Sequence, residues 1–189
     1  MVADIARTAD QAQALVLADA VLRDGLTRSA LLGAVEDLRG WPGVRNAAWV
    51  AKHADGRSET ALESLGRLSC IEGPLPVPLS NVWVGPGYPL HRVDHLWPYH
   101  WVVAEGDGAL KYRGRDPAAV VKAEKEREWA LRRLGLDVVR YDWDLAAHRH
   151  ADLAARFRHV LDVNPVRARP VQWWPVQNAF VGQDGEVAC

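Results

Sequence analysis

Three acidic residues lie on two neighbouring strand-like segments. Asp94 lies within the apolar segment 91–97, and Glu105 and Asp107 close the next segment. Side chains alternate along a strand, so Glu105 and Asp107 share a face, and pairing of the two segments brings all three carboxylates close together. Like charges held that close repel unless a cation intervenes, and oxygen ligands suit Mg²⁺ or Mn²⁺. The spacing therefore predicts a divalent metal site.

A turn explains part of the same pattern without any metal. Gly106, Asp107 and Gly108 are residue types that turns favour. Turn chemistry does not explain Asp94, which stands inside an apolar strand. Both interpretations of the glycine-rich segment stay open, and Asp94 favours the metal site.

Glu63 is a fourth candidate acid, upstream of the two segments. Thr60 and Glu63 have the spacing of a capping box, in which the threonine and the glutamate satisfy backbone amides at the start of a helix. Capping alone is a sufficient role for Glu63. The alternative is that the same helix brings Glu63 near the metal.

The predicted helix after the acidic segment carries a charged pair on its inward edge. Arg127 lies on the apolar stripe of this helix and Glu124 borders it. An acid and an arginine in such places need partners. They form either a buried structural ion pair, or they face the acidic site and orient its carboxylates through hydrogen bonds.

The elements that position these residues follow from local signals. The capping box starts a helix at Thr60, and Asp116 with Pro117 starts another that ends before Gly135. Strand composition and turns predict an antiparallel meander, a further strand and a last helix, over 77–84, 90–97, 100–104, 136–141 and 145–161. The order helix, three-stranded meander, helix, strand, helix predicts an α/β fold.

Two flanking regions differ from this core. Residues 1–57 are rich in alanine and leucine at helical spacing, with Thr27 as a helix cap, and we expect a helical support region. Residues 164–189 contain several prolines and no hydrophobic period, which predicts an irregular tail. Nine tryptophans stand out in the composition, and we expect most of those before the tail to belong to the core.

The composition excludes some classes of protein. The 23 basic and 24 acidic side chains are balanced overall. Residues 111–133 hold eight Lys or Arg against four Asp or Glu, and this local excess of positive charge forms either a contact surface for a polyanion or a solvated helix face. Two cysteines supply no disulfide framework and no apolar run is long enough to cross a membrane. We expect a cytoplasmic protein with no membrane partner, and a homodimer stays open.

The spaced motifs together resemble one family of the PD-(D/E)XK superfamily. It is the very-short-patch-repair-like domain of unknown function at the C-terminus of actinobacterial AbiEi-type antitoxin proteins, and the similarity covers about residues 58–163. The matching residues are Ser58, Thr60, Glu63, Ser64, Arg67, Arg92, Val93, Asp94, Glu105, Asp107, Gly108, Lys111, Tyr112, Glu124, Lys125, Arg127, Glu128, Leu131, Gly135, Val139, Arg140, Tyr141 and Trp143.

The resemblance implies a restriction-endonuclease-like core that hydrolyses phosphodiester bonds of DNA. Asp94 and Glu105 would hold Mg²⁺ or Mn²⁺, with Asp107 as a further ligand. The chain departs from the pattern at Asp107, which stands where the superfamily places a lysine. Lys111, four residues on, has a flexible side chain that could supply the missing cation.

Three hypotheses follow. The first is a Mg²⁺-dependent DNA endonuclease. The second is a non-catalytic regulator, similar to a type IV toxin–antitoxin antitoxin or a transcriptional regulator, whose nuclease fold binds DNA or a cognate toxin; the missing lysine motivates it. The third is an interaction domain whose acidic residues bind no metal.

Overall fold

The computed structural model describes residues 1–87, 90–108 and 117–176, with the side chains of α6 described from residue 122 onward. The helices are α1 Val2–Thr8, α2 Gln11–Arg23, α3 Arg28–Glu36, α4 Val44–His53, α5 Ala61–Glu72, α6 Pro117–Arg133, α7 Trp143–His148 and α8 His150–Val163. The strands are β1 Leu79–Val84, β2 His91–Trp97, β3 Val102–Asp107, β4 Asp137–Asp142 and β5 Trp173–Pro175.

The five strands form one mixed sheet in the order β4-β3-β2-β1-β5. β1, β2 and β3 are an antiparallel meander, as predicted, and β4 pairs with β3 in parallel. A parallel neighbour needs a long crossover, which α6 provides between β3 and β4. The prediction of an α/β fold with this element order is therefore confirmed.

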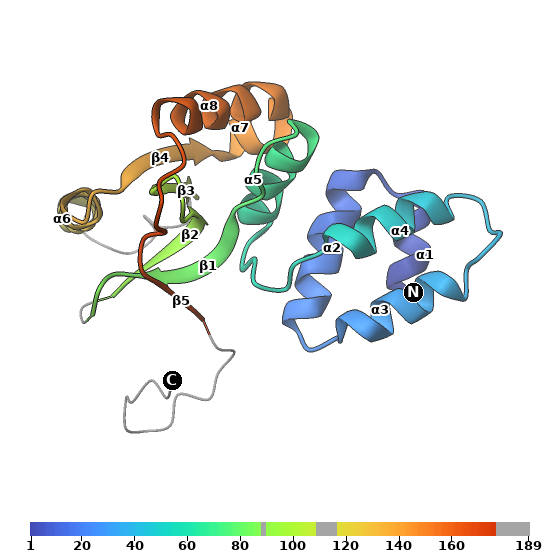
Figure 1. The fold of residues 1–189 in the computed structure, drawn as a ribbon. Coiled ribbons are helices and arrows are strands. Elements are labelled where there is room, and N and C mark those ends of the chain that lie inside the picture. The colour runs from blue at the N-terminus through green and yellow to red at the C-terminus, as the bar shows by residue number, and fades with distance from the viewer. Residues whose placement is uncertain (88–89, 109–116, 177–189) are drawn as a thin grey trace.

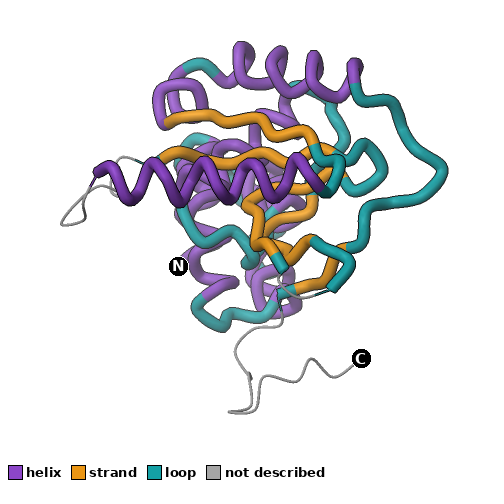
Figure 2. The backbone as a smooth tube through the Cα atoms, turned by 90° about the vertical axis from the view of Figure 1, so that its left-hand side faces the viewer, coloured by secondary structure: helices purple, strands orange, loops and turns teal. Residues whose placement is uncertain are grey.

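Helices cover both faces of the sheet (Figures 1 and 2). α5, α7 and α8 lie on one face, where Tyr141 and Phe157 are fully buried. α6 lies on the other face and buries Leu131 against Leu96 and Val103. Each face of the sheet therefore has its own close-packed apolar core, and the core on the α6 face supports the polar residues that lie on that face.

The local helix signals act as predicted. The Thr60 hydroxyl accepts a hydrogen bond from the Glu63 amide, 3.2 Å away, and Thr27 caps α3 through Ala30 in the same way. Gly135, with φ of +84°, ends α6 in the left-handed conformation that glycine adopts easily. The predicted cap Asp116 lies outside the described residues.

The N-terminal helices α1–α4 pack beside α5, away from the sheet (Figure 1). A buried ion pair joins the two parts: Arg67 of α5 donates to both carboxylate oxygens of Asp19 in α2, at 2.7 and 3.0 Å. The prediction of a helical region before the core is confirmed, and this pair makes it continuous with the core.

Three expectations need correction. The tail contains regular structure, because Trp173–Pro175 pairs with β1 as an edge strand. The last predicted helix is interrupted at Arg149, where φ of −132° and ψ of 51° separate α7 from α8. Most of the tryptophans expected in the core are exposed at the surface, namely Trp41, Trp83, Trp129 and Trp143.

Within the described ranges, no helix combines the length and the apolar character that a membrane crossing requires.

Candidate acidic site between α5, α6 and the sheet

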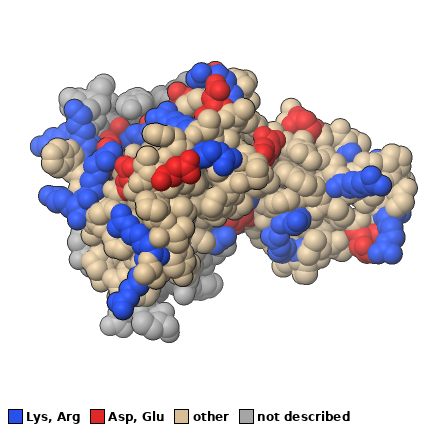
Figure 3. All heavy atoms as spheres, turned by 45° about the horizontal axis from the view of Figure 1, so that its top comes forward, with Lys and Arg blue, Asp and Glu red and all other residues tan. Residues whose placement is uncertain are grey.

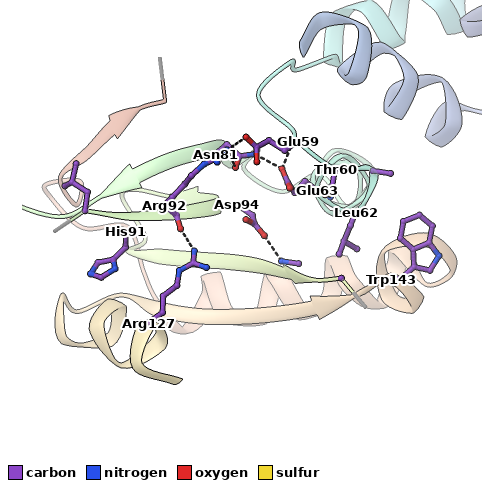
Figure 4. Close-up of a pocket in the computed structure, with 14 residues that line it drawn as sticks. Glu59, Thr60, Leu62, Glu63, Asn81, His91, Arg92, Asp94, Arg127 and Trp143 are labelled. Atoms are coloured by element: carbon purple, nitrogen blue, oxygen red, sulfur yellow. Dashed lines mark hydrogen bonds and ion pairs between the residues drawn. The ribbon is translucent and has the colours of Figure 1, made fainter. Parts of the chain in front are cut away.

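A cavity of about 890 Å³ opens where the N-terminus of α5 faces the sheet (Figure 4). Its lining comes from α5, β1, β2, β3, α6 and the first residue of α7. Glu59, Glu63 and Asp94 supply acidic groups, Arg92 and Arg127 supply cations, and Trp143 adds an aromatic wall. The cavity therefore holds both charge signs and an apolar surface.

Asp94 lies where β2 and β3 stop pairing. The ladder between these strands ends at the pair His95–Ala104, so Asp94 and Glu105 occupy the next positions. Asp94 Oδ2 accepts a hydrogen bond from the Gly106 amide at 2.9 Å. In the part of the chain that the structure describes, the other carboxylate oxygen has no hydrogen-bond partner. Asp94 thus keeps an oxygen available to a ligand in the cavity.

Glu63 caps α5 and also lines the cavity. It accepts hydrogen bonds from the Glu59 amide at 2.8 Å and from the Thr60 hydroxyl at 2.9 Å, which confirms its capping role. It also lines the cavity, and Asn81 Nδ2 donates to it. Burial raises the pKa of Glu63, and the nearby charge of Asp94 raises it further. Two carboxylates therefore face each other closely enough to interact electrostatically.

Asn81 is a site residue that the sequence interpretation missed. It lies within β1 with φ of +47°, a left-handed conformation that asparagine tolerates better than most residues. This conformation interrupts β1 opposite Asp94 and turns the amide toward Glu63, Arg57 and Arg92. An asparagine within a predicted strand was the only available signal.

Arg127 faces the acidic site rather than its helix neighbour Glu124. Its guanidinium donates to Glu105 Oε1 at 2.8 Å and also to the Arg92 carbonyl oxygen. Glu105 is 3% exposed, so this contact neutralises a carboxylate that is almost fully buried. In the part of the chain that the structure describes, Arg127 therefore pairs with Glu105 and not with Glu124.

Asp107 is directed toward β4. Its carboxylate accepts from Arg140 at 2.8 Å, and Glu128 of α6 lies 3.5 Å from the same guanidinium. Burial disfavours the Arg140 cation, but the charges of Asp107, Glu105, Glu124 and Glu128 outweigh it and raise the pKa of Arg140. Half-buried Glu124 thus acts on Arg140 electrostatically.

The structure brings the predicted acids together only in part. Asp94 and Glu105 hold neighbouring positions on β2 and β3, whereas Asp107 is engaged by Arg140. Over residues 1–87, 90–108 and 117–176, no three His, Cys, Asp or Glu side chains are grouped so as to hold a metal ion. Lys111, the predicted helper, lies outside the described residues.

A buried histidine lies behind the site on the opposite face of the sheet. His95 Nε2 is 2.9 Å from the Tyr141 hydroxyl, and both rings are fully buried. Burial lowers the pKa of His95 to about 4, although the charge of Asp94 acts in the other direction. Burial also raises the pKa of Tyr141 well above its ordinary value, so both groups are neutral at neutral pH.

This histidine makes stability depend on pH. Below its ordinary pKa of 6.5, His95 takes up a proton in the unfolded chain but not in the folded one. Stability is therefore lost as the pH falls from about 6.5 to about 4, by roughly 3 kcal/mol. Urea unfolding at neutral and acidic pH will measure this loss. We expect His95→Gln, which cannot titrate, to remove most of it; an unchanged loss in the variant would contradict the assignment to His95.

The fold and the site thus define an α/β protein with one mixed sheet and a cavity of acidic and basic side chains where β2 and β3 stop pairing. The chain is similar to two proteins of Mycobacterium tuberculosis, "Uncharacterized protein Rv2248" of strain ATCC 25618 / H37Rv and "Uncharacterized protein MT2308" of strain CDC 1551 / Oshkosh. Each is 35% identical over 161 residues, which is 84% of this chain. The chain spans 58% of the length of these relatives. No family model and no solved structure matches it.

Proposed function

We propose that the chain is a PD-(D/E)XK-type, Mg²⁺-dependent nuclease domain that hydrolyses phosphodiester bonds of DNA. The observation that carries the proposal is the placement of Asp94 and Glu105 at neighbouring positions where β2 and β3 separate, beside a cavity. The element order of helix, meander, helix and parallel strand supports the same fold type.

The donor set fits Mg²⁺ or Mn²⁺. Mg²⁺ usually keeps several waters and binds through one or two carboxylates together with substrate phosphates. Asp94 and Glu105 would supply these two carboxylates, and Glu63, whose pKa is raised by burial and further by the Asp94 charge, lines the same cavity. A bound ion would lower the pKa of a water and offset charge on the phosphate.

The residues of the chain itself supply the positive charge. The superfamily lysine is replaced by Asp107, but Arg127 of α6 contacts Glu105 and lines the cavity. Arg92, one-third exposed, lines the same cavity from β2, where it pairs with Glu59. Guanidinium groups match phosphate geometry with two parallel hydrogen bonds, so Arg92 and Arg127 suit the binding and orientation of a phosphodiester.

The test is cleavage of supercoiled, linear and mismatched DNA by the purified protein. We expect cleavage with Mg²⁺ or Mn²⁺ and none with EDTA. Asp152→Asn is the matched control for replacement of Asp94 by asparagine, because Asp152 is an exposed acid on α8. This control variant should cleave like the wild type. If all three DNA forms stay intact with either metal, the proposal fails.

A second candidate function has an observation of its own. Arg127 and Arg140 neutralise Glu105 and Asp107, so protein groups already balance part of the acidic charge. Such pairing suits a non-catalytic platform, like an antitoxin or transcriptional regulator, that binds DNA or a toxin. Binding to promoter DNA of its own operon, or to a neighbouring toxin, without any response to Mg²⁺ would favour this candidate.

Replacing Arg127 separates the two candidates. If a metal binds at Asp94 and Glu105, Arg127 competes with it for Glu105, and Arg127→Met should tighten Mn²⁺ binding by about tenfold, since a hydrogen bond to a charged group contributes about 1.5–3 kcal/mol. The same variant should bind DNA less tightly. Isothermal titration with Mn²⁺ measures the first effect and fluorescence anisotropy the second.

Arg39→Met is the control, because Arg39 is exposed in the turn after α3 and pairs only with Glu36 in the described chain. It should leave both affinities unchanged. A platform that uses no metal gives no heat with Mn²⁺ in any of the three proteins, and that outcome would reject the nuclease proposal.

A further inference from the structure

Trp143 forms a rigid aromatic wall of the cavity. It is the first residue of α7 and follows β4 directly, and Asp142 caps the helix by accepting from the Leu145 amide at 2.9 Å. One turn further along this short helix, Ala146 is fully buried. The backbone that carries the indole is therefore fixed, while the side chain stays 50% exposed beside Leu62 (Figure 4).

The indole of Trp143 differs from those of two other tryptophans. A guanidinium lies over the rings of Trp41 and Trp101, from Arg7 at 5.2 Å and from Arg167 at 4.6 Å. In the ranges that the structure describes, no aromatic ring and no guanidinium stacks on Trp143. An exposed indole inside a cavity offers a face on which another planar group can stack.

The rest of the cavity identifies the chemistry of that planar group. Arg92 and Arg127 lie on the far side of Asp94 from Trp143 (Figure 4). Two guanidinium groups at one end and an indole at the other complement a nucleotide, which joins an anionic phosphate to a flat base. A cavity of about 890 Å³ is within the size range of small-ligand sites, so a nucleotide fits.

A positive surface continues from this end of the cavity. Lys122, Lys125, Arg132 and Arg133 are exposed on α6. Lys and Arg gather on the side of the molecule where α6 lies, at the left of Figure 3. Such a surface attracts the phosphates of a strand that extends beyond the cavity. A nucleotide within a DNA strand therefore suits the charge of this surface.

We propose that the cavity takes up one unpaired nucleotide of DNA, with its base stacked on Trp143 and its phosphate held by Arg92 and Arg127. This inference rests on the proposed function and adds its substrate class. Bases inside a duplex have both faces covered, so a base reaches Trp143 only from a single strand or after leaving the stack. The domain would then act on single-stranded, mismatched or distorted DNA in preference to a regular duplex.

The experiment measures binding of a short fluorescein-labelled single strand by anisotropy, in EDTA so that no cleavage occurs. Trp143→Ala should weaken binding by about tenfold or more, because stacking on an aromatic side chain contributes about 1–3 kcal/mol per base. Trp143→Phe, which keeps an aromatic face, should recover most of the affinity. Trp129→Ala is the control, because Trp129 is an exposed tryptophan on α6 that does not line the cavity. This variant should change binding less than Trp143→Ala.

A strand of abasic residues separates stacking from any other role of the indole. The wild type and Trp143→Ala should bind this strand equally, because no base is present. Equal affinity of the two proteins for the normal strand, or an equal loss on both strands, would overturn the inference. If the protein cleaves DNA but Trp143→Ala binds the normal strand as well as the wild type does, the nuclease proposal stands and the stacking proposal is rejected. If Trp143→Ala loses affinity but the protein cleaves no DNA, the stacking proposal stands and the nuclease proposal is rejected.

Discussion

Asp94→Asn is expected to abolish metal-dependent cleavage of DNA while the protein stays folded. Asparagine preserves the size of the side chain and still accepts the Gly106 hydrogen bond, but it removes the charge that a divalent cation requires. Changing even the partners that orient a metal ligand costs 10- to 100-fold in activity or metal affinity, so loss of a ligand itself should cost roughly 100-fold or more. Initial rates of cleavage with Mn²⁺ measure the effect.

The Asp94 variant also has an internal control. Its DNA affinity in EDTA should stay at or above the wild-type value, because removing a negative charge from the cavity does not repel phosphate. Its unfolding free energy should remain close to that of the wild type. Cleavage by Asp94→Asn at the wild-type rate would show that Asp94 has no role in the reaction and that any nuclease activity resides elsewhere.

The sequence predicted the elements of the fold whose signals are local. Thr60 and Gly135 mark helix ends through contacts within one turn, so their effect is visible in a short window. β5 could not be predicted in this way, because Trp173–Pro175 becomes a strand only through pairing with the distant β1. A segment with prolines and no period carries no local sign of such a partner.

The sequence was sufficient to identify the acidic residues of the site, but not all of the residues with which they pair. The two-residue period and the meander were enough to place Asp94 beside Glu105. The pairing of Asp107 with Arg140 depends on the parallel register of β3 and β4, which sets Glu105 opposite Arg140. Register is fixed by packing of whole elements, so the spacing of residues within one strand could not reveal it.

Trp143 shows a second limit of sequence interpretation. Composition alone favours a buried role for a large apolar residue, and Trp97 follows that rule at 2% exposure. Trp143 differs because it starts a helix at the rim of the sheet, next to Gly106 and Gly108 that contribute no side chains to cover it. Only the assembled cavity distinguishes an aromatic wall from a core residue.

The buried pair of Asp19 and Arg67 links the N-terminal helices to the core that positions Glu63. Arg67 also donates to the carbonyl oxygen of His53, the last residue of α4, and Asp19 accepts from the Asp55 amide at 2.7 Å, so both partners are tied to the C-terminal end of α4 and the residues just after it. Burial raises the pKa of Asp19 even with Arg67 opposite it. The pair therefore carries a desolvation cost that is offset only while both partners are present.

Arg67→Met should consequently lower the free energy of unfolding by about 3–5 kcal/mol, since it leaves an uncompensated carboxylate in a site that is 1% exposed. Urea unfolding followed by circular dichroism measures the loss. Arg57→Met is the matched control: Arg57 pairs with Asp55 at a similar distance but is 46% exposed, and its loss should be within about 1 kcal/mol. The double variant Arg67→Met with Asp19→Leu removes both charges and should recover much of the stability. A loss for Arg67→Met no larger than that for Arg57→Met would show that α1–α4 are not anchored to α5 through this pair, and that packing between α2 and α5 alone joins the two regions.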